Sequence, residues 1–157
     1  MQVYFLRHGL ADWPDWDEAR DDERPLTDEG VARMQAAAKT LKRFELGLDA
    51  ILSSPYLRAR QTAQTVAGRL GLAVIEEPAL APGFDVTRLR EVLRRHAQAQ
   101  ALMLVGHEPD FSRTIAQLIG GGRVAMKKGG LARVDLAAID PPGGELVWLL
   151  APKVLTI

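Results

Sequence analysis

The chain has 157 residues, with 20 Lys or Arg against 20 Asp or Glu, so its formal net charge is zero. This length fits a single domain, residues 1–157, and 47% apolar with 25% charged residues is typical of a folded globular protein. The balanced charge argues against a nucleic-acid binder, which usually carries a basic excess. The absence of cysteine excludes disulfides, thiolate nucleophiles and Cys-ligated zinc.

The apolar run near the N-terminus, Val3–Leu6, is too short for the hydrophobic region of a signal peptide. No stretch of the sequence approaches the roughly 20 apolar residues that are needed to cross a bilayer. We therefore expect a soluble, cytoplasmic protein that associates with neither membranes nor nucleic acid.

In the first half of the chain, short apolar runs alternate with helical periodicity. The run Val3–Leu6 predicts a strand, and Thr27 is an expected N-cap for a helix that ends near Phe44. Apolar side chains recur at spacings of three or four along this helix, at Val31, Met34, Ala38 and Leu41. A second strand, Ala50–Ser53, precedes a helix that opens at Ser53-Ser54-Pro55 and runs to the Gly68–Gly71 region.

The second half continues the alternation as far as the glycines at 120–122. A strand at Ala73–Ile75 precedes a helix around Thr87–Gln98, with Leu89, Val92 and Leu93 on one side. A strand at Leu102–Val105 precedes a helix that begins at Pro109 or Asp110. This last helix is expected to bury Phe111, Ile115, Leu118 and Ile119.

The end of the chain has a different pattern. Leu131–Ile139 and Glu145–Ala151 read as two strands joined by a turn at residues 141–144. The whole order of elements predicts an α/β fold with a mostly parallel sheet and an antiparallel C-terminal pair.

Two histidines follow predicted strands directly. Arg7-His8-Gly9 comes after the first strand, and Val105-Gly106-His107 ends the fourth. A lone loop histidine is usually solvated or structural. Ligands of open α/β sheets, however, bind beyond the carboxyl ends of the strands, and the neighbouring glycines allow close approach. Together, His8 and His107 therefore indicate a site.

Two arginines complete the candidate site. Arg58 lies in the first turn of the helix after the second strand, and Arg7 precedes His8. Although a helix arginine is commonly a solvated cation, these two suit an anion clamp, because the guanidinium fork matches phosphate oxygens. The helix N-termini at Pro55 and Pro109 would add partial positive charge.

Two histidines and two arginines without metal-ligand spacing predict phosphoryl transfer through a covalent phosphohistidine. With an ordinary pKa of about 6.5, imidazole leaves one ring nitrogen free to attack phosphorus near neutral pH. We expect a backbone carbonyl to hold the other nitrogen. The arginines and the second histidine would then neutralise the transferring phosphoryl group.

Four motifs in order resemble the histidine phosphatase, or phosphoglycerate-mutase-like, superfamily. They are Leu6-Arg7-His8-Gly9, Pro25-Leu26-Thr27-x-x-Gly30, Ser53-Ser54-Pro55-x-x-Arg58-Ala59-x-x-Thr62-Ala63 and Val105-Gly106-His107. The short chain and the Arg24-Pro25-Leu26-Thr27 form of the second motif look most like the SixA-type phosphohistidine phosphatase branch. The resemblance implies a three-layer α/β/α sandwich, His8 as phosphorylated nucleophile, a phosphate pocket of Arg7, Arg58 and His107, and no metal or cofactor.

The sequence departs from this family in one respect. Many members supply a glutamate as general acid after the third strand, whereas residues 80–85 contain no glutamate. Asp85 is the best available carboxylate, and it is an equally good N-cap for the helix near Thr87. Because an imidazole leaving group needs far less protonation than an alkoxide, the missing acid favours a phosphohistidine substrate.

Three functions remain in competition. The first is a phosphatase for a histidine-phosphorylated protein, such as a phosphotransfer domain or a phosphocarrier. The second is a phosphatase for a small phosphorylated metabolite with the same pocket. The third is a silent module that binds phosphoprotein, against which the intact His8 counts.

Two charged segments lie outside these motifs. In Asp12–Glu23, seven of twelve residues are acidic. We interpret it first as a solvated loop with Trp13 and Trp16 packed against the body, then as a rim that selects partners, and last as a divalent metal site. Lys127 and Lys128 either face the pocket mouth or belong to a solvated loop.

Overall fold

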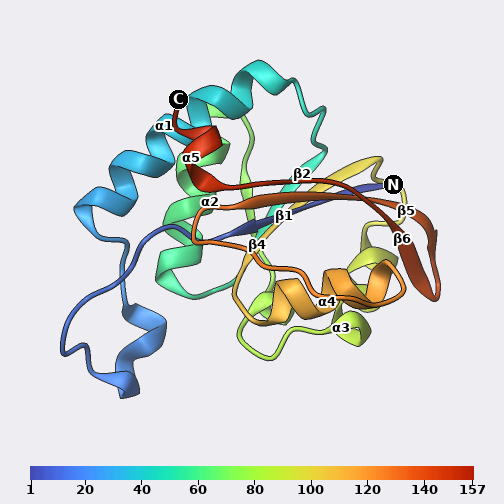
Figure 1. The fold of residues 1–157 in the computed structure, drawn as a ribbon, viewed down its shortest axis with the longest axis horizontal. Coiled ribbons are helices and arrows are strands. Elements are labelled where there is room, and N and C mark those ends of the chain that lie inside the picture. The colour runs from blue at the N-terminus through green and yellow to red at the C-terminus, as the bar shows by residue number, and fades with distance from the viewer.

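A mixed six-stranded sheet runs through the centre of the computed structural model, which describes residues 1–157 (Figure 1). Its strand order is β3-β2-β4-β1-β5-β6. Strands β1 to β4 pair in parallel, whereas β5 is antiparallel to both β1 and β6. The strands are β1 (Gln2–Arg7), β2 (Ala50–Ser53), β3 (Val74–Glu76), β4 (Ala101–Gly106), β5 (Leu131–Ile139) and β6 (Pro142–Leu150).

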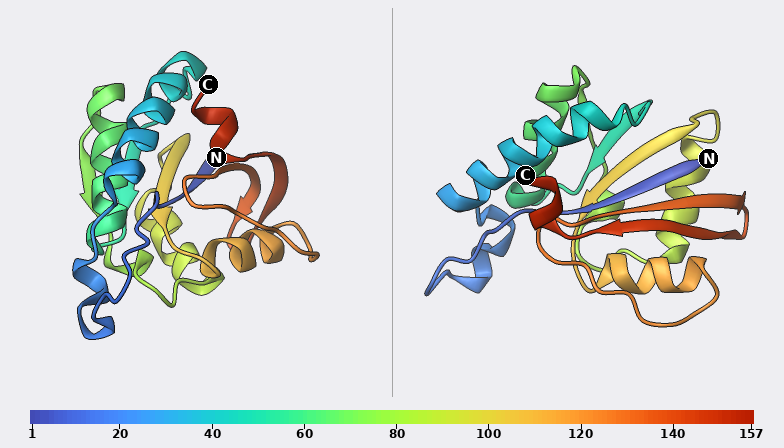
Figure 2. Two further views of the ribbon diagram at one scale, coloured as in Figure 1. Left: turned by 60° about the vertical axis from the view of Figure 1, so that its left-hand side comes forward. Right: turned by 45° about the horizontal axis from the view of Figure 1, so that its top comes forward.

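Helices cover both faces of the sheet, which gives three layers (Figure 2). One face carries α1 (Asp28–Phe44), α2 (Leu57–Leu70) and the short α5 (Pro152–Leu155). The other carries α3 (Val86–Arg95) and α4 (Asp110–Leu118). Two 3₁₀ helices, η1 (Glu18–Glu23) and η2 (Pro78–Leu80), lie in connections. None of these helices is both long and apolar enough to cross a membrane.

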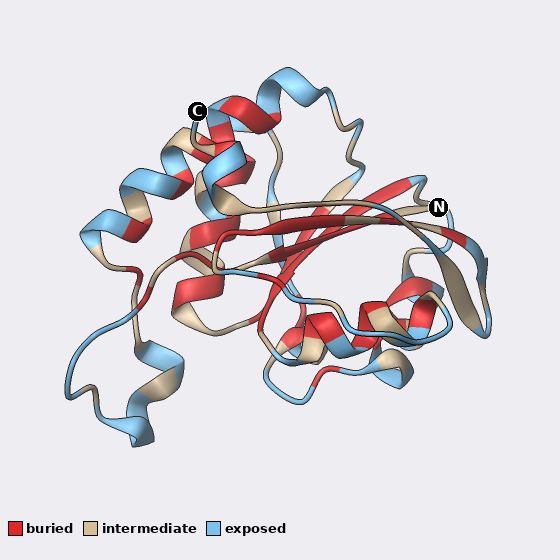
Figure 3. Cartoon of the chain, in the orientation of Figure 1, coloured by how far each residue is buried: buried red, intermediate tan, exposed pale blue.

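The core consists of two apolar clusters, one on each face of the sheet. In β1, Tyr4 and Leu6 belong to the cluster under α1 and α2, while Val3 and Phe5 belong to the cluster under α3 and α4. A strand that is buried on both faces consists of consecutive apolar residues, so such strands can be predicted from the sequence. Figure 3 shows these central strands as buried and the connection that holds η1 as largely exposed.

The α/β class and the predicted order of strands and helices are confirmed, with shifted boundaries. The second helix begins at Leu57 rather than Pro55, because Ser54 Oγ accepts the Tyr56 N–H at 3.2 Å in a turn before the helix. The third helix ends early, at Arg95.

The C-terminal hairpin is tighter than predicted. β6 already begins at Pro142, inside the expected turn. Gly144 pairs with Leu136, and a Cβ at Gly144 would lie 2.2 Å from the Asp135 carbonyl oxygen, so only glycine fits this close strand approach.

The sheet order brings the ends of three strands together. β4 lies between β1 and β2, with Arg7 opposite Gly106 and Ser53 opposite Val105. The residues that follow these strands therefore share one edge of the sheet, as the sequence predicts.

The loop that leaves β1 packs closely against the first turn of α1. The Leu10 carbonyl accepts the Thr27 N–H at 2.9 Å, and Thr27 caps the helix through the Gly30 N–H at 3.0 Å. A Cβ at Gly30 would lie 2.2 Å from the Leu10 oxygen. The glycine of the second motif thus lets the helix support the loop that carries His8.

Gly30→Ala should destabilise the protein by about 1–3 kcal/mol, because the added methyl group overpacks against rigid backbone. Gly68→Ala is the matched control in α2, where a Cβ meets nothing within 4 Å. That change should stabilise the protein by up to about 1 kcal/mol through helix propensity. Urea unfolding measures both, and equal effects in the two variants would contradict the close packing at Gly30.

Candidate active site

His8 lies just beyond β1 with only 6% of its surface exposed. Its backbone N–H donates to the Gly106 carbonyl at 3.1 Å, which ties it to the end of β4. Its Nδ1 lies 2.7 Å from the Gly9 carbonyl, so Nδ1 carries the proton and donates it. The backbone carbonyl expected to hold one ring nitrogen is therefore present, and the lone pair of His8 is on Nε2.

Arg58, in the first turn of the helix that follows β2, contacts His8. Its Nε lies 3.3 Å from His8 Nε2, and the residue is 5% exposed. The Tyr56 ring covers the guanidinium, with its centroid 5.1 Å from the central carbon. Arg58 therefore lies at the strand-end rim where the sequence places it, in contact with His8.

His107 lies beside His8, with their ring centroids 5.4 Å apart. Its Nε2 lies 2.7 Å from Ser54 Oγ, which also accepts the Tyr56 N–H. Ser54 is fully buried, so its hydroxyl proton has His107 Nε2 as its acceptor, and the imidazole proton is on Nδ1. This Nδ1 is buried and has no partner in the protein. His107 therefore presents an unused donor.

Arg7 joins the group from the end of β1. Its Nη1 donates to the Met126 carbonyl at 2.7 Å, and its buried Nε has no acceptor. Glu108, which follows His107, interacts electrostatically with Arg7, but its two carboxylate oxygens accept the N–H and hydroxyl of Ser112 at 2.8 and 2.5 Å. The four predicted residues thus gather at one sheet edge.

Both imidazoles stay uncharged at physiological pH and also at pH values well below it. Burial lowers the pKa of His8 to about 3, against the raising effect of the Gly9 carbonyl, and Arg58, Arg7 and Arg24 lower it further. Burial likewise lowers the pKa of His107 to about 3, with added effects of His8 and Arg58. His8 Nε2 is consequently an unprotonated nitrogen across the physiological range.

Sequence reasoning missed several residues that hold this geometry. Thr62 Oγ1 accepts the Gly9 N–H at 3.0 Å and donates to the Arg58 carbonyl at 2.8 Å, so it links the two motifs. Its place four residues after Arg58 in the third motif was the available signal. Ser54, in the same motif, stands at the expected start of the second helix, and no local pattern marks it as the partner of His107.

The acidic segment Asp12–Glu23 is not a simple solvated loop. Asp21 in η1 accepts from Arg58 through both its backbone oxygen and its carboxylate, at 2.7 and 3.0 Å. The expectation that Trp13 packs against the body is wrong, because it is 40% exposed and held by its Nε1–H to the Pro25 carbonyl. Trp16 is half-buried and bonds within the segment, to the Arg20 carbonyl.

The remaining candidate residues form no hydrogen bond or ion pair with His8 or His107. Asp85 is exposed and caps α3, where its carboxylate accepts the Arg88 N–H at 2.9 Å. Lys128 forms an ion pair with Asp12, and Lys127 is exposed. No group of three or more His, Cys, Asp or Glu side chains is arranged to hold a metal ion.

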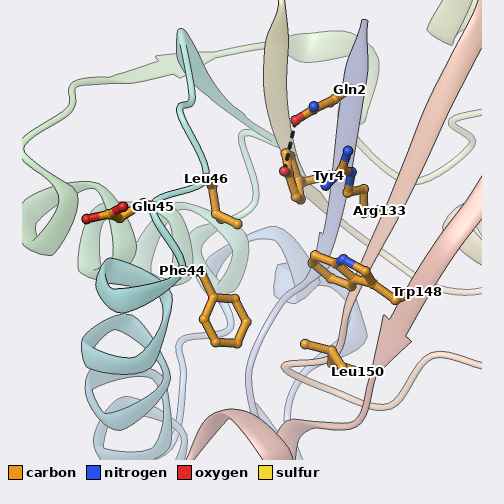
Figure 4. A pocket seen from close by; sticks show the side chains of 8 residues that line it. All are labelled: Gln2, Tyr4, Phe44, Glu45, Leu46, Arg133, Trp148 and Leu150. Atoms are coloured by element: carbon orange, nitrogen blue, oxygen red, sulfur yellow. Dashed lines mark hydrogen bonds between the residues drawn. The ribbon is translucent and has the colours of Figure 1, made fainter.

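A separate surface hollow lies elsewhere on the molecule (Figure 4). It has a volume of about 660 Å³ and opens between the end of α1 and strands β5 and β6. Its lining includes Gln2, at the amino end of β1, whereas His8 follows the carboxyl end. The full lining is Gln2, Tyr4, Phe44, Glu45, Leu46, Arg133, Trp148 and Leu150. It is therefore separate from the histidine cluster.

Sequence comparisons match this arrangement to known proteins. The sequence model of the histidine phosphatase superfamily (branch 1) matches residues 3–82. An uncharacterized protein from Picosynechococcus sp. is 38% identical over 99% of both chains. The phosphohistidine phosphatase SixA of Escherichia coli (strain K12) is 32% identical over 97% of this chain and 94% of that protein.

Solved structures agree with the sequence comparisons. The protein histidine phosphatase SixA, in complex with tungstate, superposes with a TM-score of 0.85 at 30% identity, covering 99% of both chains. A mycobacterial glucosyl-3-phosphoglycerate phosphatase superposes with a TM-score of 0.76 at 19% identity, over 96% of this chain and 99% of that chain. This second likeness concerns the fold alone.

Stability should fall as the pH drops from 7 to 5. In this window an unfolded histidine, with a pKa of about 6.5, binds a proton, whereas His8 and His107 in the folded state do not. Protonation therefore favours the unfolded chain, and each histidine alone accounts for a loss of about 2 kcal/mol at pH 5. Urea unfolding at pH 7, 6 and 5 measures this loss. His8→Gln should reduce the pH dependence, and an unchanged dependence would contradict the buried neutral imidazole.

Proposed function

Because the chain belongs to the histidine phosphatase superfamily, we propose that it hydrolyses phosphohistidine in a phosphoprotein through a phosphoenzyme formed on His8. One observation carries the proposal. The Gly9 carbonyl fixes the proton of His8 on Nδ1, so a neutral Nε2 lone pair lies in a pocket of cationic groups, 3.3 Å from Arg58. This is an activated nucleophile that needs no separate base.

In the first step His8 Nε2 attacks phosphorus. A new N–P bond forms on His8 and the N–P bond of the substrate breaks. The substrate imidazole, already protonated on its other ring nitrogen, leaves as neutral imidazole with the electron pair of the broken bond. In the second step water attacks phosphorus, the N–P bond to His8 breaks, and orthophosphate and a proton are released. His8 then regains its neutral state.

The surrounding donors suit the transferring phosphoryl group. Arg58 and Arg7 supply fixed positive charge, and the unpartnered Nδ1–H of His107 supplies a buried donor. A buried donor without an acceptor costs free energy, which a phosphoryl oxygen would recover. Preorganised donors of this kind typically stabilise the transition state by several kcal/mol. The mechanism requires no metal ion or cofactor.

The leaving group separates this proposal from a small-metabolite phosphatase. Asp85, in the segment expected to hold a general acid, accepts the Arg88 N–H, and Glu108, which follows His107 in the chain, accepts from Ser112. An imidazole leaves without a strong proton donor, whereas an alkoxide depends on one. The engaged carboxylates and the likeness to SixA therefore favour a histidine-phosphorylated protein, such as a phosphotransfer domain or phosphocarrier, as substrate.

Turnover of a phosphohistidine protein should exceed turnover of alkyl phosphate monoesters in kcat/KM, with and without EDTA. Asp85→Asn should leave the phosphohistidine rate within about twofold, because departure of imidazole does not wait for an acid. A phosphate-release assay on both substrate classes measures this. Faster alkyl monoester hydrolysis that Asp85→Asn abolishes would assign Asp85 as general acid and a small metabolite as substrate.

A further inference from the structure

Asp21 accepts hydrogen bonds from the guanidinium of Arg58. The Nη1 of Arg58 donates to the Asp21 carbonyl at 2.7 Å and its Nη2 to Asp21 Oδ2 at 3.0 Å. The remaining nitrogen, Nε, faces His8 Nε2 at 3.3 Å. Each nitrogen of this buried cation therefore already has an acceptor.

His8 and Asp21 accept from the same edge of the Arg58 guanidinium. Nε–H and one Nη2–H lie on the same side of a guanidinium and together form the fork that binds two oxygens of a carboxylate or phosphate. Along this edge of Arg58 are His8 Nε2 and the Asp21 carboxylate. A phosphoryl group on His8 Nε2 would meet the same two donors. Asp21 and the phosphoryl group thus compete for Arg58.

The Asp21 carboxylate has a second cationic partner, Arg24, which would still bind it when a phosphoryl group binds Arg58. Its Oδ1 accepts from Arg24 Nε at 3.0 Å, and Arg24 is itself anchored to the Ala11 carbonyl at 2.6 Å. Burial works to raise the pKa of Asp21, but the charges and hydrogen bonds of Arg58 and Arg24 lower it overall. The carboxylate is therefore ionised and can release Arg58 without losing its only partner.

We propose that Asp21 is a resident counter-ion of Arg58 that exchanges with the phosphoryl group and weakens the binding of free orthophosphate. This inference rests on the proposed function, in which each turnover leaves orthophosphate beside Arg58. A buried guanidinium without an acceptor is costly, so departure of phosphate would otherwise be opposed. Asp21 takes back the freed donor and so favours product release.

The same competition acts on substrate choice. A ligand that binds through its phosphate alone must displace the carboxylate with no other contact to compensate. A phosphoprotein brings additional surface contacts that offset this displacement. Asp21 is accordingly a specificity-determining residue that disfavours free phosphate and small phosphate compounds relative to a phosphohistidine protein.

The test is the affinity for inorganic phosphate, measured by isothermal titration calorimetry on the full chain. Asp21→Asn removes the competing charge, and the dissociation constant of phosphate should fall about tenfold, as expected for one charge close to the bound anion. Asp22→Asn is the matched control, because it removes the same charge from the next, exposed position and should change the constant less than twofold. Asp21→Ala should also tighten phosphate binding.

Two outcomes of the phosphate titration would overturn the proposal. Unchanged or weaker phosphate binding in both Asp21 variants, with melting temperatures like wild type, would show that Asp21 only positions Arg58 and would overturn the proposal. Equal tightening in Asp22→Asn would overturn it as well, because general charge would then explain the effect. Failure of the proposed function would look different: wild type would not turn over phosphohistidine, whatever the phosphate affinities.

Discussion

The burial of Arg58 beside His8 is the constraint on which the rest of the site depends. A guanidinium that is 5% exposed requires acceptors for its donors, and the protein supplies them from η1 and from the end of β1. The same burial strips water from His8 and keeps its imidazole neutral. A charged clamp and an uncharged nucleophile can therefore lie side by side.

This constraint gives the acidic connection from β1 to α1 one structural role, which Asp21 carries. Asp21 lies in η1, outside the layers of helices that cover the sheet, and it meets Arg58 at the first turn of α2. Arg24, three residues later, ties the segment to the backbone at Ala11. The loop that carries His8 is also held by Thr62, one turn after Arg58 in α2, which accepts the Gly9 N–H. Each motif of the chain thus supports another rather than acting alone.

The order of strands and helices and the placement of the two histidines were predictable from the pattern of apolar residues in the sequence. Strands buried on both faces read as apolar runs, and the topology of parallel strands then puts His8 and His107 at one edge. The role of Asp21 was not predictable, because its contact joins positions 37 residues apart and no local pattern marks it. The contact between Ser54 and His107 was not predictable either, because it joins positions 53 residues apart.

The likeness to distant phosphatases concerns the shared sheet and helices, whereas substrate choice depends on side chains around the pocket. Here Asp21 pairs with Arg58 and Arg24, the carboxylate of Glu108 accepts from Ser112, and Asp85 caps α3. The arrangement fits a reaction limited by phosphoryl positioning rather than by proton supply.

Trapping of the phosphoenzyme tests the central claim most directly. The protein is mixed with a phosphohistidine protein that carries radiolabelled phosphate, quenched in base within one turnover, digested and mapped by mass spectrometry. The account predicts label on Nε2 of His8, stable in base and lost in acid, and none in His8→Asn. Label on His107, or full turnover by His8→Asn, would contradict it.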